Sequence, residues 1–194
     1  MSASNASILP VELSKSYRLL NHGPTVLVSA RHGGVDNVMA AAWACALDFA
    51  PPKLSVVLDK STRTRQLVDR SGWFAIQVPT LKQARLVHEV GTHSAVDDPG
   101  KLERAGVAWF EQPGFDLPFV AGCSAWMACR LIPEPHNQNT YDLYIAEIVG
   151  AWADSRVFRD GHWRFEHAPS DLRSLHYVAG GHFYAIGDAV DVTP

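Results

Sequence analysis

The chain has 194 residues, of which 47% are apolar, with a formal charge of −3 at pH 7 and an isoelectric point near 6.3. This length and apolar content are enough to bury one full hydrophobic core, so we predict a single domain over residues 1–194. The weak negative charge gives no general attraction to nucleic acid or to an anionic membrane, and we expect neither as a partner.

No apolar run in the sequence is long enough to cross a bilayer. The first ten residues, MSASNASILP, lack the basic start and apolar middle of a secretory signal, so we expect a loose terminus over residues 1–10 and a soluble, cytoplasmic protein. The three cysteines, an odd number, do not form a disulfide framework. We interpret Cys45, Cys123 and Cys129 as small buried side chains.

The first half of the chain predicts a group of strands. Residues 17–20 either begin the sheet or contact a partner chain, and residues 24–30 are a β-rich run. A hairpin-type turn over residues 32–36 leads into a strand over 37–47, and a turn at Pro51 and Pro52 leads into another strand over 53–58. Two strands joined by such a hairpin would form the first wall of a barrel.

Four alanines fall between residues 40 and 44. Small side chains in a strand let a flat ring approach the backbone amides closely, whereas the same composition also suits a helix. Because Asp36, Asn37 and the double proline flank the run, we favour the strand.

Hydroxyl and cationic side chains gather at residues 60–64, where a helix is predicted to begin. The free N–H groups and the dipole of a helix N-terminus favour an anion, and Arg63 and Lys60 would add charge-assisted hydrogen bonds to a phosphate. The ordinary alternative is that Ser61 or Thr62 caps the helix and that the cations are solvated.

Later segments alternate short helices with strands. Helices are predicted over residues 62–69, 81–88 and 101–106, and strands over 73–78, 107–110, 119–132 and 141–152. This order fits an α+β, mostly β, barrel better than a sandwich or a parallel sheet. The glycine-rich signatures of dinucleotide-binding and P-loop domains are missing.

The stretch from His88 to His93 superficially resembles a zinc-protease motif. It has one residue too many between Glu89 and His93 for the two histidines to share a helix face, and Gly91 is expected to interrupt the helix. We therefore expect no metal site here or elsewhere.

Five segments together resemble the flavin reductase family of FMN-binding split barrels, which includes flavoredoxin and ferric reductase. They are NVMAAAW at 37–43, the Pro51–Pro52 pair, STRT at 61–64, GWFAIQV at 72–78 and HYVAGGHFY at 176–184. The resemblance spans most of the chain and depends on the order and spacing of the segments. It implies an antiparallel split β-barrel with short peripheral helices.

The resemblance also implies FMN as the cofactor. The phosphate would lie at the helix start, the flavin ring along the alanine-rich strand, and the closing segment beside the ring. The residues implied to bind FMN are Lys60, Ser61, Arg63 and Thr64 for the phosphate, then Asn37, Met39, Ala41, Ala42, Trp43, Ala44 and Cys45 for the ring, and His176 and Tyr177 in the closing segment. Hydride transfer to a flavin needs no protein acid or base, so no catalytic residue is named.

The activity that the resemblance implies is an NAD(P)H-dependent flavin reductase. Electrons would pass to flavin, oxygen, ferric iron or an oxygenase component, and a homodimer would build the flavin site at its interface. Two alternatives stay open: an oxidase that resembles pyridoxamine-phosphate oxidase, and a non-catalytic barrel that carries flavin or haem. The sequence does not distinguish NADH from NADPH.

Overall fold

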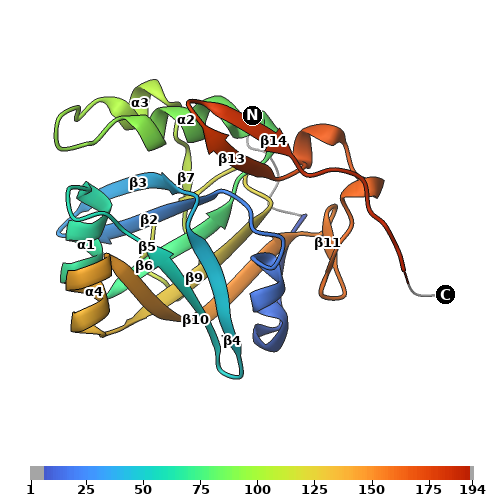
Figure 1. The fold of residues 1–194 in the computed structure, drawn as a ribbon, viewed down its shortest axis with the longest axis horizontal. Helices are drawn as coiled ribbons and strands as arrows, with labels where there is room; N and C mark the ends of the chain where they lie inside the picture. Colours follow the sequence, from blue (N-terminus) through green and yellow to red (C-terminus); the bar gives the residue numbers. More distant parts are fainter. Residues whose placement is uncertain (1–6, 193–194) are drawn as a thin grey trace.

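The centre of the protein is one antiparallel sheet that curls into a barrel (Figure 1). The computed structural model describes residues 7–192. The sheet runs in the order β3-β2-β6-β9-β10-β5-β4, and β1 pairs with β10 beside this path. Its strands are β1 (Ile8–Pro10), β2 (Val26–His32), β3 (Val35–Ala41), β4 (Ala44–Phe49), β5 (Pro52–Val57), β6 (Trp73–Val78), β9 (Ala125–Ile132) and β10 (Leu143–Asp154).

The two ends of this sheet are consecutive in the chain. β3 ends at Ala41, β4 begins at Ala44, and only Ala42 and Trp43 separate them. No strand pairing joins β3 to β4 in the described part of the chain, so the barrel is open along that line. The protein is therefore an antiparallel split barrel of the α+β class, and the predicted fold is confirmed.

Alternation along the strands divides the apolar side chains into two layers. Phe74 and Ile76 on β6 and Met127 on β9 point into the barrel, with Val26 and Val28 from β2. The intervening side chains belong to a second cluster outside the barrel wall, which includes Leu27, Ala75, Trp126, Val87 and Phe119. Because the strand period is two, the same strands cover both layers.

Helix α1 (Arg63–Ser71) follows β5 and packs on β2 and β3. The Thr62 side chain accepts a hydrogen bond from the Arg65 N–H at its start, and Gly72, at φ 72°, ends it. Helix α4 (Pro135–Tyr141) packs on β10, begins with a proline and ends at Asp142 with a left-handed backbone. The sequence prediction of α1 is confirmed, whereas α4 was not predicted.

The remaining elements cover the barrel, and several gather on one side of it. In Figure 1, α2 (Ala84–Thr92), α3 (Lys101–Arg104) and the hairpin of β13 (Leu175–Ala179) and β14 (His182–Ala185) lie together above β2 and β3. The other short elements are the strands β7 (Trp109–Phe110), β8 (Phe119–Val120), β11 (Phe158–Arg159) and β12 (His162–Trp163), and the 3-10 turns η2 (Leu13–Leu19), η3 (Leu81–Gln83), η4 (Phe165–His167) and η5 (Ser170–Leu172).

Several expected boundaries are wrong. The strand expected over 37–47 is two strands, because the chain crosses from one edge of the sheet to the other at Ala42 and Trp43. The strand expected over 119–132 is broken at residues 121–124, and Cys123 lies in that break rather than on one strand with Cys129. The strand expected over 107–110 is only β7, and the one expected over 141–152 is β10, which begins at Leu143.

Three further expectations are also corrected. The expected loose terminus is wrong for Ile8–Pro10, which pairs with β10, while residues 1–6 lie outside the described residues. Residues 17–20 form no strand, because most of them belong to η2. Gly91 does not interrupt the helix, since α2 continues to Thr92. Within residues 7–192, no helix has the length and apolar character needed to span a membrane.

Candidate functional site

The candidate site begins where β3 meets the first turn of α1. Asn37 on β3 is only 2% exposed, and its Nδ2 donates a hydrogen bond of 2.8 Å to Oγ1 of Thr64, which is also buried. The Oδ1 atom of Asn37 is buried and has no hydrogen-bond partner within residues 7–192. A buried carbonyl oxygen without a donor costs about 1–3 kcal/mol, so this atom indicates a missing ligand donor.

Two hydroxyl side chains precede α1, and one of them is its N-cap. Thr62 caps the helix, whereas Ser61 donates from Oγ to Oδ1 of Asp59 at 2.6 Å. That hydrogen bond and the Ser61 N–H, which also binds Asp59, hold the pKa of Asp59 below its usual value. The Lys60 ammonium is exposed and lies 3.8 Å from Asp142. The capping alternative is thus confirmed for Thr62.

Arg63 lies beside Asn37 in a hollow of about 430 Å³, which we call the Asn37 hollow. Its Nη1 donates to Oε1 of Gln66 at 2.9 Å, and Arg63 forms no ion pair in the described part of the chain. A guanidinium with no carboxylate partner is available to an anion. The hollow is lined by Val35, Asp36, Asn37, Arg63, Gln66, Ala95, Val96, Pro99 and Leu102.

A second, smaller pocket lies farther along β3, and we call it the His88 pocket. It has a volume of about 160 Å³ and is enclosed by β3, α2 and the β13–β14 hairpin. Its lining residues are Thr25, Ala40, Ala41, Ala42, Val87, His88, Gly91, Thr92, Tyr177 and Phe183. Ala41, Ala42 and Tyr177 are among the residues that the family resemblance implies, whereas Ala40 and His88 were not assigned to the site.

Asn37 in the first hollow and Ala40 in the second are three residues apart on β3. Three residues of extended chain span about 10 Å, so a long ligand can reach both hollows along the strand. β3 is the end strand of the sheet, and within residues 7–192 it pairs only with β2. Gly91 allows α2 to approach, since a Cβ at this position would lie 3.1 Å from Cβ of Ala40.

Eight predicted residues line neither hollow: Lys60, Ser61 and Thr64 near the start of α1, His176 in β13, and Met39, Trp43, Ala44 and Cys45. Met39 and Ala44 pack against the core inside the barrel. Trp43 is 75% exposed and Cys45 is exposed, so the expectation that all three cysteines are buried is wrong for Cys45. Cys123 and Cys129 are buried as predicted, and burial raises the pKa of both thiols well above the usual range.

His176 is directed away from the His88 pocket. Its Nδ1 lies 3.1 Å from the carbonyl oxygen of Gly23, and its ring meets the edge of His22 at 5.8 Å between centroids. His22 lies among the rings of Trp163, Phe165 and His176. Its Nε2 lies 3.0 Å from Oγ of Ser174, and burial, together with the nearby His176, lowers its pKa to about 4.

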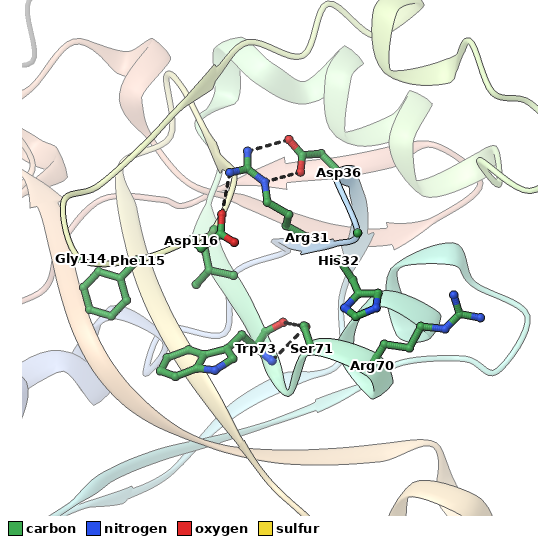
Figure 2. A pocket seen from close by; sticks show the side chains of 12 residues that line it. Arg31, His32, Asp36, Arg70, Ser71, Trp73, Gly114, Phe115 and Asp116 are labelled. Atoms are coloured by element: carbon green, nitrogen blue, oxygen red, sulfur yellow. Dashed lines mark hydrogen bonds and ion pairs between the residues drawn. The ribbon is translucent and has the colours of Figure 1, made fainter.

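The largest cavity in the described residues, about 750 Å³, lies elsewhere, at the tip of the β2–β3 hairpin (Figure 2). It contains none of the residues predicted to bind a cofactor. Its Arg31 is already held by both carboxylate oxygens of Asp36, at 2.6 and 2.9 Å, and by Asp116 at 2.9 Å. Because its main cation is neutralised in this way, we place the candidate site along β3.

Several residues that line the two hollows, including Gln66 on α1 and His88 on α2, were not predicted from the sequence. Gln66 follows Arg63 by three positions, so both lie on one face of α1, and this spacing was available in the sequence. His88, Gly91 and Thr92 share one face of α2 by the same rule. Their proximity to Tyr177 depends on the β13–β14 hairpin folding back over α2. No local sequence pattern predicts that arrangement.

The protein is a split barrel with two hollows along its end strand β3. The start of α1 and the Arg63 guanidinium lie at the first hollow, and Ala40 to Ala42 line the second. No cluster of three or more metal-binding side chains occurs within residues 7–192. Residues 18–186 match the model of the flavin reductase like domain, and the chain belongs to that family. The predicted family is confirmed.

Three relatives illustrate the match. The protein YddH of Escherichia coli (strain K12), described as uncharacterized, is 40% identical over 185 residues, which cover 94% of this chain and 96% of YddH. An FMN-binding domain of a flavin reductases-like enzyme from Shewanella baltica OS155 is 66% identical, with a TM-score of 0.95 over 96% of this chain and 97% of that one. Nitrilotriacetate monooxygenase component B from Bacillus cereus, 19% identical, shares the fold, with a TM-score of 0.69 over 99% of this chain and 98% of its own.

Proposed function

We propose that the protein binds FMN along β3 and acts as an NAD(P)H-dependent flavin reductase. The observation that carries the proposal is the buried Oδ1 of Asn37, which lacks a donor and lies beside the start of α1. The 66% identity to the FMN-binding domain from Shewanella baltica OS155 supports the same cofactor.

The residues present fit the parts of FMN. Arg63, with the first turn of α1 and its dipole, would hold the phosphate, and Ser61 and Lys60 lie close enough in sequence to add contacts. Oδ1 of Asn37 would accept a hydrogen bond from a ribityl hydroxyl. Ala41 and Ala42 offer a flat, small-residue wall to the ring.

When bound, FMN supplies two-electron chemistry with a nicotinamide and one- or two-electron chemistry with an acceptor. The protein's part is to hold the ring against β3, where Ala41 and Ala42 form one wall of the His88 pocket. Hydride transfer to a flavin needs no acid or base from the chain. The acceptor is flavin, oxygen, ferric iron or an oxygenase component.

We further propose that the protein works as a homodimer in the cytoplasm, with the flavin site at the interface. The outer face of β4 supports the dimer, because its large apolar side chains alternate outward and are exposed: Leu47 by 55% and Phe49 by 64%, next to Trp43. An exposed row of this kind is typical of an interaction surface.

The test is an anaerobic absorption titration of the purified protein with FMN, followed by NADH and then NADPH. We expect FMN to bind at close to one per chain and its visible absorption to bleach with one of the two nicotinamides. Binding without bleaching by either would contradict the reductase and favour a carrier or an oxidase with another substrate. Absence of FMN binding would overturn the cofactor site.

A further inference from the structure

A buried lysine begins α3, and it has no carboxylate partner. Lys101 is only 3% exposed and forms no ion pair within residues 7–192. Lysine is almost never buried in this way, because the ammonium loses its hydration. The hydrogen bonds of Lys101 therefore have to compensate for that loss, and they indicate what the residue is for.

The Lys101 ammonium binds the C-terminal end of α2. Its Nζ donates to the carbonyl oxygen of His93 at 3.0 Å and to that of Val90 at 3.4 Å. The last carbonyl groups of a helix have no partner within the helix and carry the negative end of its dipole, so a cation is favourable there. Burial lowers the pKa of Lys101 to about 8, against an opposing effect of Asp98, so the ammonium is still mostly charged at pH 7.

The chain between the two helices, residues 94–100, has few other attachments, and we call it the 94–100 loop. Within the described part of the chain, its hydrogen bonds stay inside the loop or go to α3. The Asp98 N–H donates to the Ser94 carbonyl at 2.9 Å, and Nη1 of Arg104 donates to Oδ1 of Asp98 at 2.9 Å. These contacts shape the loop but do not fix it to α2. The Lys101 ammonium supplies that link.

The 94–100 loop forms one wall of the Asn37 hollow. Ala95, Val96 and Pro99 line the hollow from this loop. Asn37 and Arg63 line it from β3 and α1. In Figure 1 the loop joins α2 to α3 above β3, on the side of the view where α1 lies. Val96 is 53% exposed, so the core does not hold this wall in place. The width of the hollow therefore depends on how the loop is fixed.

Helix α3 also makes an apolar contact that does not involve the ammonium. Leu102 and Ala105 pack against the cluster outside the barrel wall, which includes Val87 and Val90 of α2. A variant that loses only the ammonium keeps this contact. We therefore expect such a variant to fold and its 94–100 loop to loosen.

We propose that Lys101 is a positioning residue that holds the 94–100 loop over the Asn37 hollow and so slows the release of a bound flavin nucleotide. Lys101 does not itself line the hollow, so it acts through the loop. The proposal rests on the proposed function, because the phosphate and the ribityl chain of FMN are placed in this hollow. A wall that must move before the ligand leaves affects mainly the dissociation rate.

The test makes two measurements on the native protein, on Lys101→Met and on Lys82→Met. Lys82 is exposed and has no ion pair among the described residues, so its variant controls for the loss of one positive charge. Hydrogen exchange of the FMN-free protein, followed by mass spectrometry, should be roughly 5-fold faster in the 94–100 loop of Lys101→Met and unchanged in β6. Stopped-flow measurement should show FMN dissociating roughly 10-fold faster from Lys101→Met, the effect of losing a charged hydrogen bond.

The outcomes separate this proposal from the proposed function. Lys101→Arg, which keeps the charge and N–H donors, should restore part of the slow dissociation. Unchanged loop exchange in Lys101→Met, faster exchange with unchanged FMN dissociation, or an equal effect of Lys82→Met would each overturn the proposal. If FMN does not bind the native protein, the proposed function fails, while the exchange measurement still decides whether Lys101 fixes the loop. Lys101→Gln, which keeps N–H donors without the charge, takes the place of Lys101→Met if that variant does not fold.

Discussion

Nδ2 of Asn37 donates to Oγ1 of Thr64 at 2.8 Å, and this hydrogen bond joins β3 to α1 across 27 residues of chain. Both side chains are buried. The bond uses the amide nitrogen and leaves the amide oxygen buried and, within residues 7–192, without a donor, in a residue that lines the Asn37 hollow. The contact that orients the asparagine thus also fixes the position of this acceptor.

Replacing Asn37 by alanine should weaken FMN binding about tenfold, the effect of one lost hydrogen bond with its orienting contact. Thr64→Val should weaken FMN binding less, because the amide stays in place and loses only its anchor. Both affinities can be measured by quenching of flavin fluorescence. Asn139→Ala, on the exposed face of α4, is the matched control. An Asn37→Ala protein that binds FMN like the native one would rule out the ligand role of Oδ1.

Arg63→Gln should weaken FMN binding by roughly 10-fold or more, because a charge-assisted hydrogen bond to phosphate is lost. Riboflavin, which lacks the phosphate, should bind the native and variant proteins equally. Arg85→Gln, an exposed arginine on α2 with no ion pair among the described residues, is the control for net charge. An equal loss for riboflavin and FMN would show that Arg63 does not contact the phosphate.

Gly150 lies at a bulge in β10 where two aromatic rings meet. A Cβ there would lie 2.7 Å from Cη2 of Trp152 and 2.8 Å from Cζ of Phe115, and these two rings already touch edge to face at 5.4 Å. Gly150→Ala should therefore lower the free energy of unfolding by about 1–3 kcal/mol through overpacking. Urea denaturation measures the change. Gly187→Ala, with nothing within 4 Å of the new Cβ, should change it little.

The features that the sequence predicts well are local ones. The strand at residues 73–78 is found as β6, because a short run of mostly apolar residues, a preceding glycine and a following proline all mark it. The start of α1 is also predicted from a local signal, because Thr62 is a normal N-cap. Helix α4 was missed because it has no buried residue and hence no apolar stripe, although Pro135 at its first turn was a start signal.

The parts that were not predicted depend on contacts between distant segments. The break at Ala42 and Trp43 follows from closing the sheet, which periodicity within one apolar run does not report. Likewise, His176 and Tyr177 are neighbours in one strand and so point to opposite faces. Only Tyr177 reaches the His88 pocket, whereas His176 meets His22.

The buried His22 should make stability depend on pH in the acid range. Its pKa is lowered to about 4 by burial and by His176, against about 6.5 when unfolded, so the unfolded chain binds more protons between these values. Stability is therefore complete above pH 6.5 and falls as the pH drops toward 4, by up to about 3 kcal/mol. His22→Phe keeps an aromatic ring against Trp163 and Phe165 and should flatten this part of the profile.

Urea denaturation of the native protein and His22→Phe at pH 4.5, 5.5 and 7 checks this expectation. His136→Gln, an exposed histidine, should retain the slope of the native protein. A profile of His22→Phe that remains as steep as the native one would assign the acid sensitivity to other groups.

The outward face of β4 should control assembly. Leu47→Ser with Phe49→Ser removes two large exposed apolar side chains from this face, and neither packs in the barrel core. We expect light scattering to give a mass near twice 21.3 kDa for the native protein and near 21.3 kDa for the double variant. FMN affinity should fall with dissociation, because the proposed site lies at the interface. Val190→Ser, an exposed valine near the C-terminus, should leave both unchanged. A native protein that is monomeric and still binds FMN tightly would contradict the interfacial site. The residues along β3 of a single chain would then be sufficient to bind FMN.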